Sequence, residues 1–167
     1  MSARISPARV EDAEELADLH LDVWEEAYAG LMSASVFAER RGGRAARVES
    51  WRTIIGAGSS DNLLAWSDEW SDDGALVGFS STGPGRDDAA DDLPGLEVMA
   101  LYVRAEVYGT GVGHALLTAA IGPAEAYLWV LDGNSRAIAF YERQGFVFDG
   151  VEKPEDVGLH RRMVRRA

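Results

Sequence analysis

The chain has 167 residues, the size of one ordinary domain and enough to bury a hydrophobic core. Its formal net charge of −12 argues against nucleic-acid binding, because phosphates are bound by clustered lysine and arginine side chains. The absence of cysteine excludes disulfides and thiol nucleophiles, and without a signal segment or a run of roughly 18 apolar residues we expect a cytoplasmic protein that does not enter membranes.

A short strand at Arg4–Ile5 precedes the first predicted helix. Asp12 and Glu15 have the spacing of a helix N-cap with a capping box, and Gly30 stands at the other end. Between them, apolar residues recur at helical spacing at positions 16, 19, 23 and 27. A second helix is predicted from Ser33 to about residue 52, interrupted or bent near the glycine pair 42–43.

Two large aromatic residues lie beside the apolar stripe of the first helix. Trp24 and Tyr28 are four residues apart and therefore share one helix face. They can be core residues or contacts to a ligand, and both interpretations remain open at this point.

The middle of the chain predicts three strands. Leu63–Trp66 and Ala75–Ser81 pair antiparallel through the acidic turn 67–74, and a solvated loop at 83–94 leads to a central strand at Glu97–Val103. The acidic loop residues are predicted to be solvated charges and not a metal site: Asp87, Asp88, Asp91 and Asp92. No metal is expected, because His20, His114 and His160 lack metal-ligand spacing.

A glycine-rich turn, YGTGVGH at 108–114, follows this strand and opens an apolar helix at 115–121. In such a turn, bare backbone N–H groups can hold a phosphate, but glycines can also simply turn a tight corner. A P-loop would require Lys-Ser/Thr where His114 and Ala115 stand. A dinucleotide fingerprint would require a glycine at 114 and an opening βαβ unit, which the three preceding strands argue against.

The last third predicts a strand at 127–131, a helix at 134–144 and closing strands at 146–148 and 159–165. Asn134 is a natural N-cap, and Gly145 stands where a C-terminal cap is preferred. Tyr141 lies two turns beyond Asn134 on the same side of the helix. The two can be a cap and an amphipathic aromatic, or polar groups of a site beside the sheet. We expect one α/β domain over residues 1–167.

Three segments resemble the GNAT family of N-acetyltransferases. LEVMALYVRAEVYGTGVGHALL (96–117) is similar to its acetyl-CoA-binding motif, a bulged strand followed by Q/R-x-x-G-x-G/A, with Tyr108 at the Q/R position. LWVLDGNSRAIAFYERQGFVFDG (128–150) is similar to its pattern of strand, Asn, Ala, Phe-Tyr and Gly-Phe, and LHLDVWEEAYAGLM (19–32) resembles its N-terminal segment. The resemblance implies an α/β (α+β) fold with a mixed, mostly antiparallel sheet of six to seven strands and about four helices.

The resemblance also implies a function. The protein would move an acetyl group from acetyl-CoA to a primary amine of a small molecule or peptide, by direct attack in a ternary complex. Tyr141 would be the general acid that protonates the departing thiolate, while Glu97 can be the general base or a solvent-facing strand residue. The implied cofactor contacts are the backbone of Leu101, Tyr102 and Val103, the N–H groups of Gly109, Thr110, Gly111, Val112, Gly113 and His114, and the side chain of Asn134.

The acceptor is less constrained. Trp24 and Tyr28 would contact it, with the acidic segment 86–94 as a lid, and the net negative charge suits a cationic amine. The terminal strand at 159–165 offers an edge for a homodimer. The alternative function is a non-catalytic acyl-CoA-binding or acyl-CoA-sensing module with the same fold.

Overall fold

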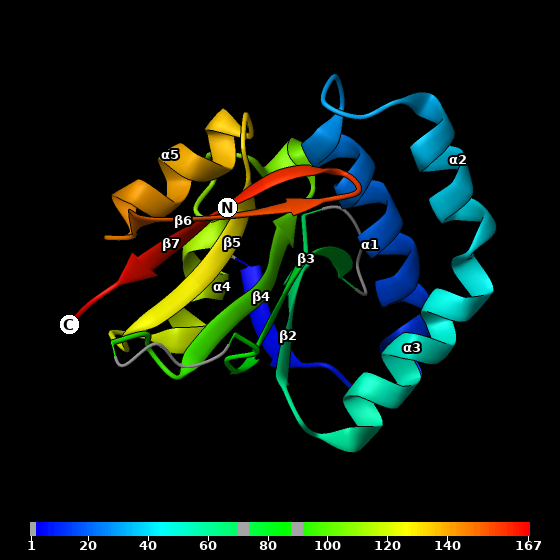
Figure 1. Ribbon diagram of the computed structural model, residues 1–167. Coiled ribbons are helices and arrows are strands. Elements are labelled where there is room, and N and C mark those ends of the chain that lie inside the picture. Colours follow the sequence, from blue (N-terminus) through cyan, green and yellow to red (C-terminus); the bar gives the residue numbers. More distant parts are fainter. Residues whose placement is uncertain (1–2, 70–73, 88–91) are drawn as a thin grey trace.

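The computed structural model describes residues 3–69, 74–87 and 92–167, so parts of the predicted acidic turn and acidic loop lie outside the described residues. A seven-stranded sheet runs through the molecule in the order β1-β2-β3-β4-β5-β7-β6 (Figure 1). Neighbouring strands are antiparallel except β4 and β5, which are parallel. The strands are β1 (Ala3–Pro7), β2 (Asp61–Ser67), β3 (Ala75–Pro84), β4 (Leu96–Val103), β5 (Ala126–Leu131), β6 (Val147–Glu155) and β7 (Gly158–Arg165). The predicted mixed, mostly antiparallel sheet is confirmed.

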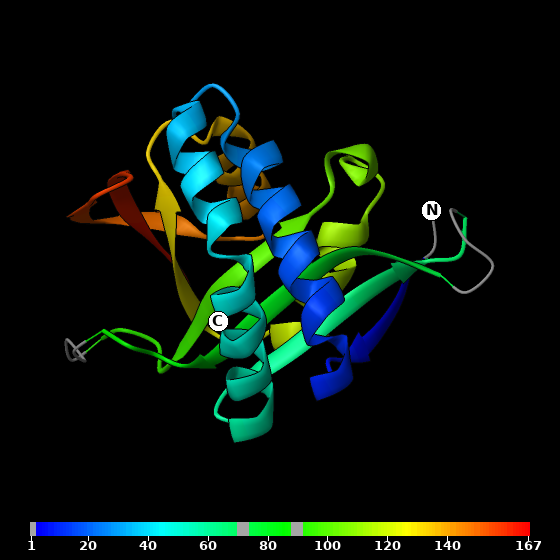
Figure 2. The same ribbon diagram turned by 90° about the vertical axis from the view of Figure 1, so that its right-hand side faces the viewer.

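Helices cover both faces of the sheet. They are α1 (Ala13–Tyr28), α2 (Ala34–Gly42), α3 (Arg44–Ala57), α4 (Val112–Ile121) and α5 (Ser135–Arg143). The described residues thus form five α-helices where about four were predicted, because the helix expected to be interrupted or bent near 42–43 is interrupted there and forms two helices, α2 and α3. Figure 2 shows α1, α2 and α3 on one face. Helices α4 and α5 pack on the other face through Leu117, Ile121 and Tyr141, among others.

The predicted capping box at the start of α1 is wrong. Asp12 has helical backbone angles, φ −79° and ψ −5°, and its side chain makes no cap bond to α1. Its carboxylate instead accepts a hydrogen bond of 2.7 Å from the backbone N–H of Arg9. A short 3₁₀ turn at Val10–Asp12 therefore precedes α1. The Asp12 carboxylate accepts a hydrogen bond from the backbone N–H group of Arg9, which would otherwise lack a partner at the start of this turn.

Strand β4 is irregular in the middle of the sheet. Ser81 of β3 pairs with Ala100 and Thr82 pairs with Val98, so Met99 is the extra residue of a β-bulge. On its other side β4 pairs with β5 only through Glu97 and Val98, after which the two strands diverge (Figure 1). The following residues of β4 therefore present an edge without a neighbouring strand on that side. Because unpaired backbone N–H and C=O groups are costly to bury, such an edge is suited to receive a ligand.

Gly78 holds β3 tightly against this part of β4. A Cβ atom at this position would lie 2.7 Å from Cγ1 of Val103 and 2.9 Å from the carbonyl oxygen of Tyr102. We expect Gly78→Ala to lower the free energy of unfolding by about 1–3 kcal/mol, because the backbone of β4 must move to make room. Urea unfolding monitored by circular dichroism measures this.

Gly56→Ala is the matched control for that measurement. Gly56 lies in α3, and a Cβ atom there would have nothing within 4 Å. We expect no loss, or a gain of about 0.5–1 kcal/mol from the higher helix propensity of alanine. Equal unfolding midpoints for Gly78→Ala and the parent would contradict the tight packing.

Candidate functional site

A cleft of about 320 Å³ opens where β4 and β5 diverge. One wall is the bulged strand, residues 98–103, and the opposite wall comes from Trp129 and Val130 of β5 together with α5. Its remaining boundary is formed by the end of α1 and the glycine turn before α4. Most of the predicted site residues meet here: Tyr28, Leu101, Tyr102, Val103, Gly109, Gly111, Gly113, His114, Asn134 and Tyr141.

The glycine turn places donor groups at the mouth of the cleft. Gly109 and Gly111 have positive φ values of 76° and 94°, which a side chain would strain. Helix α4 begins at Val112, and its first internal bond runs from Ala115 N–H to the Gly111 carbonyl. The first-turn N–H groups of Val112, Gly113 and His114 thus have no acceptor within the helix. Together with the helix dipole, they form a cradle that favours an anion.

One residue of the turn, Thr110, differs from the prediction. The N–H group of Thr110 donates to the carbonyl oxygen of Val107 at 3.2 Å, and its hydroxyl donates to the same oxygen at 2.7 Å. Thr110 therefore stabilises the turn from within and does not offer a donor to the cleft. The side chain of Val112 is buried in the core, so only its backbone can contribute.

Arg136 is a cleft residue that the sequence interpretation missed. Its guanidinium carbon lies 3.5 Å from the ring centroid of Tyr108, and both residues line the cleft. Tyr108 occupies the motif position where glutamine or arginine is expected. An arginine of α5 thus lies over the Tyr108 ring and brings a positive charge to this position. In the sequence, the one indication of a role for Arg136 is the tyrosine at position 108 in place of glutamine or arginine, because Arg136 and Tyr108 are far apart along the chain.

Three tyrosine hydroxyls surround the inner part of the cleft. Those of Tyr28 and Tyr102 lie 2.9 Å apart in a hydrogen bond, and Tyr141 is buried nearby with 8% of its surface exposed. Burial raises the pKa of all three, most strongly for Tyr102 and Tyr141. The three phenols consequently remain protonated near neutral pH, so they can donate hydrogen bonds but cannot act as bases.

Asn134 caps α5 and also lines the cleft. Its side-chain oxygen accepts a hydrogen bond of 3.3 Å from the N–H group of Ala137, which confirms the predicted N-cap of α5. It is also buried and lines the cleft. Since the oxygen is used by the cap, the amide nitrogen is the atom available to a ligand.

Glu97 is neither solvent-facing nor part of the cleft. Its side chain is 2% exposed and lies near the start of β4, before the bulge. The guanidinium of Arg86 donates to it at 2.6 and 3.0 Å, the backbone N–H of Arg86 at 3.0 Å, and the Tyr127 hydroxyl at 3.2 Å. Burial raises the pKa of this carboxyl, but the bonds and charge of Arg86 outweigh that effect and the net pKa is lowered. This placement favours a structural role for Glu97, and its assignment as the base stays a prediction.

Trp24 also lies outside the cleft. It is 8% exposed, and its ring packs edge-on against Tyr28 at 4.8 Å and Phe37 at 5.8 Å. Of the predicted pair, Tyr28 reaches the cleft and Trp24 supports it from behind. The core interpretation holds for Trp24, because one helical turn carries its ring away from the opening.

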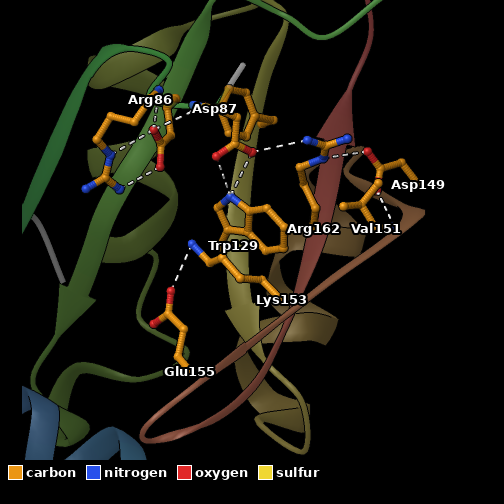
Figure 3. Close-up of polar contacts among 10 residues, drawn as sticks. Arg86, Asp87, Trp129, Asp149, Val151, Lys153, Glu155 and Arg162 are labelled. Carbon is orange, nitrogen blue, oxygen red and sulfur yellow. Dashed lines mark hydrogen bonds and ion pairs between the residues drawn. The ribbon is translucent and has the colours of Figure 1, made fainter. Parts of the chain in front are cut away.

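The segment after β3 is fixed over β5 and β7. Asp87 accepts hydrogen bonds of 3.1 Å from the indole nitrogen of Trp129 and from Arg162, which also donates to Asp149 at 2.7 Å (Figure 3). The prediction of a solvated charge is wrong for Asp87, because the fold brings a cation and an indole donor to it. Asp88 and Asp91 lie outside the described residues. In the part of the predicted lid that the structure describes, Arg86 and Asp87 are anchored.

Two further properties concern the described parts of the chain only. Among residues 3–69, 74–87 and 92–167, no group of three or more histidine, aspartate or glutamate side chains could hold a metal ion. None of the helices found there is long and apolar enough to cross a membrane.

Comparison with known proteins gives matches along most of the chain. A sequence model of the acetyltransferase (GNAT) family matches residues 14–146. A probable N-acetyltransferase of Mycobacterium tuberculosis is 28% identical over 150 residues, which cover 88% of this chain and 81% of that protein.

Solved structures share the fold. The PaiA N-acetyltransferase of Thermoplasma acidophilum in complex with coenzyme A has a TM-score of 0.72 at 21% identity, with both chains covered completely. NAA60 of Arabidopsis thaliana in complex with a bisubstrate analogue has a TM-score of 0.70 at 16% identity, with 98% of each chain covered.

Proposed function

This chain belongs to the acetyltransferase (GNAT) family, and we propose that it transfers the acetyl group of acetyl-CoA to a primary amine by direct attack within a ternary complex. One observation carries the proposal. A single cleft is lined by three features: the unpaired edge of β4, the first turn of α4 with its free N–H groups, and Tyr141. An extended thiol-bearing chain with a phosphate end would find partners along its whole length there.

The donor would lie along the cleft in a defined direction. The amide groups of pantetheine would pair with the backbone of Leu101, Tyr102 and Val103, as an added strand does at a sheet edge. The pyrophosphate would take the N–H groups of the glycine turn, from Gly109 to His114 without Thr110, with Arg136 adding charge. Asn134 would donate from its amide nitrogen. The acetyl thioester would then lie among the tyrosine hydroxyls.

The transfer needs one proton to leave nitrogen and one to reach sulfur. The neutral amine attacks the carbonyl carbon, a C–N bond forms, and the C–S bond breaks to release a thiolate. Tyr141 would donate a hydrogen bond to that sulfur. Because a thiol has a pKa of about 8.5 and burial raises the pKa of Tyr141 far above this, complete proton transfer from the phenol is uphill. We therefore assign Tyr141 the role of stabilising the thiolate by a hydrogen bond. The thiolate is then protonated by the proton that the nitrogen has released.

The base is the part of the mechanism that changes from the sequence interpretation. No aspartate or glutamate belongs to the cleft lining within the described residues, and Glu97 is held by Arg86 outside it. We propose that the ammonium proton leaves through water and that the Tyr28–Tyr102 hydroxyl pair orients the neutral amine.

Calorimetry and a turnover assay test this function. We expect CoA and acetyl-CoA to bind with similar affinity and NAD not to bind. A panel of primary amines assayed for release of CoA thiol should then contain at least one acceptor. Binding of NAD but of neither CoA species would overturn the proposal. CoA binding without thiol release for any amine would favour the non-catalytic acyl-CoA-sensing alternative. The cytoplasmic location, the homodimer and the domain bounds 1–167 remain predictions.

Arg136→Gln tests the phosphate end of the cleft. We expect CoA affinity to fall about tenfold (~1.4 kcal/mol), because one solvent-exposed charged contact is lost, and the loss should shrink at high salt. Affinity for pantetheine, which has no phosphates, should not change. Arg166→Gln is the charge-matched control, since Arg166 pairs with Asp92 at 2.9 Å near the C-terminus. An equal loss for pantetheine would show that Arg136 acts on the fold rather than on the phosphates.

A further inference from the structure

Two arginines contact the face of α1 whose last residue, Tyr28, lines the cleft. His20, Trp24 and Tyr28 follow one another on this face at intervals of four residues. The guanidinium carbon of Arg40 in α2 lies 3.7 Å from the Trp24 ring centroid. In α3, Nη1 of Arg47 lies 3.2 Å from Nδ1 of His20. Figure 2 shows α2 and α3 beside α1 in front of the sheet.

In the part of the chain that the structure describes, these arginines lack anionic partners. The other half-buried arginines are bound: Arg52, Arg104, Arg161 and Arg162 pair with carboxylates, and Arg165 donates to two carbonyls. Within the described residues, Arg40 and Arg47 have neither a carboxylate nor a carbonyl acceptor, and Arg47 contacts only the imidazole of His20. The Nε atom of each is buried without a hydrogen-bond partner. A buried donor of this kind is costly, and the cost is greater for a charged group.

Neighbouring positive charges and burial lower the pKa values of the basic groups in this region. Burial lowers the pKa of Arg40, and the neighbouring charge of Arg47 lowers it further. The pKa of His20 is lowered to about 3, by burial first and then by Arg47 and Arg40, so the imidazole is neutral at ordinary pH. The tyrosines facing this region, Tyr28 and Tyr102, are neutral as well. In a chain with 28 acidic and 16 basic residues, this is a local site of uncompensated positive charge.

The position of this charge relative to the reacting groups follows from α1. The ring of Trp24, under Arg40, packs against Tyr28, whose hydroxyl reaches Tyr102 in the cleft. Trp24 and His20 stand one and two turns of α1 from Tyr28, so their Cα atoms are roughly 6 and 12 Å away along the helix axis. The face of the Arg40 guanidinium makes a cation–π contact with the Trp24 ring. The N–H donors lie at the edge of the guanidinium, and within the described residues this edge has no hydrogen-bond acceptor.

We propose that Arg40 and Arg47 bind an anionic group of the acceptor, so that the acceptor is a primary amine with a carboxylate or phosphate several bonds from its nitrogen. This inference rests on the proposed function. Arginine suits the task because its planar donors match both oxyanions. The reacting nitrogen would lie near Tyr28 and Tyr102, and the anion one to two helical turns away.

Matched acceptors test the substrate class. We compare 6-aminohexanoate with hexylamine, and aminoalkyl phosphates with the corresponding aminoalcohols, by CoA-thiol release. At least one anionic member should have a kcat/KM about tenfold or more above its neutral partner. Among ω-amino acids, 6-aminohexanoate should exceed glycine, because glycine cannot span the distance. The carboxylate and phosphate pairs show which oxyanion is preferred. Equal kcat/KM values within every pair would overturn the inference.

Substitutions assign the preference to the two arginines. Arg40→Gln and Arg47→Gln should each lower kcat/KM for the anionic acceptor by roughly 10–100-fold, with Arg47→Lys recovering part of the loss. Arg44→Gln is the control on the same helix as Arg47, since Arg44 is exposed and pairs with Asp18 at 2.5 Å. The Arg44→Gln variant should keep the full preference for the anionic acceptor. Retention of the preference in both arginine variants would overturn the assignment.

Direct anion binding separates this inference from the proposed function. Inorganic phosphate is titrated into the protein already saturated with CoA, which would fill the pyrophosphate cradle, and Tm is followed. Phosphate should raise the Tm of the parent and of Arg44→Gln but not that of Arg47→Gln. That result without acetylation of any amine would support the anion site and count against the proposed function. Acetylation of amines with the same phosphate effect in Arg47→Gln would overturn the anion site alone.

Discussion

Replacing Tyr141 with phenylalanine is expected to slow turnover by roughly 10²–10⁴-fold and to leave acetyl-CoA affinity close to that of the parent. The substitution removes only the hydroxyl that, in the proposed mechanism, would face the developing thiolate. The ring remains, so its edge-on contacts with Phe140 at 5.2 Å and Phe146 at 5.7 Å are preserved. A loss confined to the chemical step is therefore the expected signature.

Single-turnover kinetics is the appropriate measurement, because slow product release can hide a change in chemistry. Tyr127→Phe is the matched control. Its hydroxyl bonds Glu97 outside the cleft, and we expect its single-turnover rate to stay near that of the parent. A Tyr141→Phe rate equal to that of the parent would remove Tyr141 from the thiolate role.

Glu97→Ala is expected to lower the free energy of unfolding by about 2–4 kcal/mol at pH 7. Removing one partner of a buried ion pair costs about 3–5 kcal/mol when the remaining charge stays buried. The remaining charge here is Arg86, whose side chain is 65% exposed, so water can solvate it and the expected loss is smaller. What remains is the loss of several hydrogen bonds to a carboxylate and the space left in the sheet. Denaturant unfolding measures the change.

The contribution of the Glu97 carboxylate to stability depends on pH with a definite sign, which Glu97→Gln tests. Arg86 holds the pKa of Glu97 below its unfolded value of about 4.3. A carboxyl with a lowered folded pKa stabilises the protein above the unfolded pKa, and that contribution disappears as pH falls through the folded value. The stability difference between parent and Glu97→Gln should thus be largest near neutral pH and shrink below about pH 4.3. A difference that grows on acidification would contradict the lowered pKa.

The same variant tests whether Glu97 is a base. Because Glu97 lies outside the cleft, we expect the acidic limb of the kcat/KM profile to persist in Glu97→Gln at an unchanged pH midpoint. Arg86→Gln is a useful comparison, since it loosens the same ion pair from its exposed side. Disappearance of the acidic limb in Glu97→Gln alone would restore Glu97 to the catalytic role.

Elements with a strong local pattern could be predicted from the chain alone. The apolar stripe of α1, the strand β4 and the Asn134 cap of α5 depend on contacts between residues close in sequence, so periodicity and capping chemistry identify them. The turn from Gly109 to Gly113 could be recognised for a similar reason, since the positive φ values of Gly109 and Gly111 favour glycine. These features also carry the resemblance to the family.

The identity of each polar group's partner was decided only by the tertiary structure. Glu97 lies on a predicted strand, yet its role depends on Arg86 and Tyr127, which the sheet brings to it from two other segments. Trp24 and Tyr28 look equivalent in sequence and are equally buried, yet Trp24 packs against Phe37 of α2 while Tyr28 lines the cleft. Arg136 meets Tyr108, and Arg40 and Arg47 meet α1, across distant parts of the chain. Local pattern determines which elements form and which backbone can hold the donor. Charges and hydroxyls act through neighbours that only the packed fold supplies.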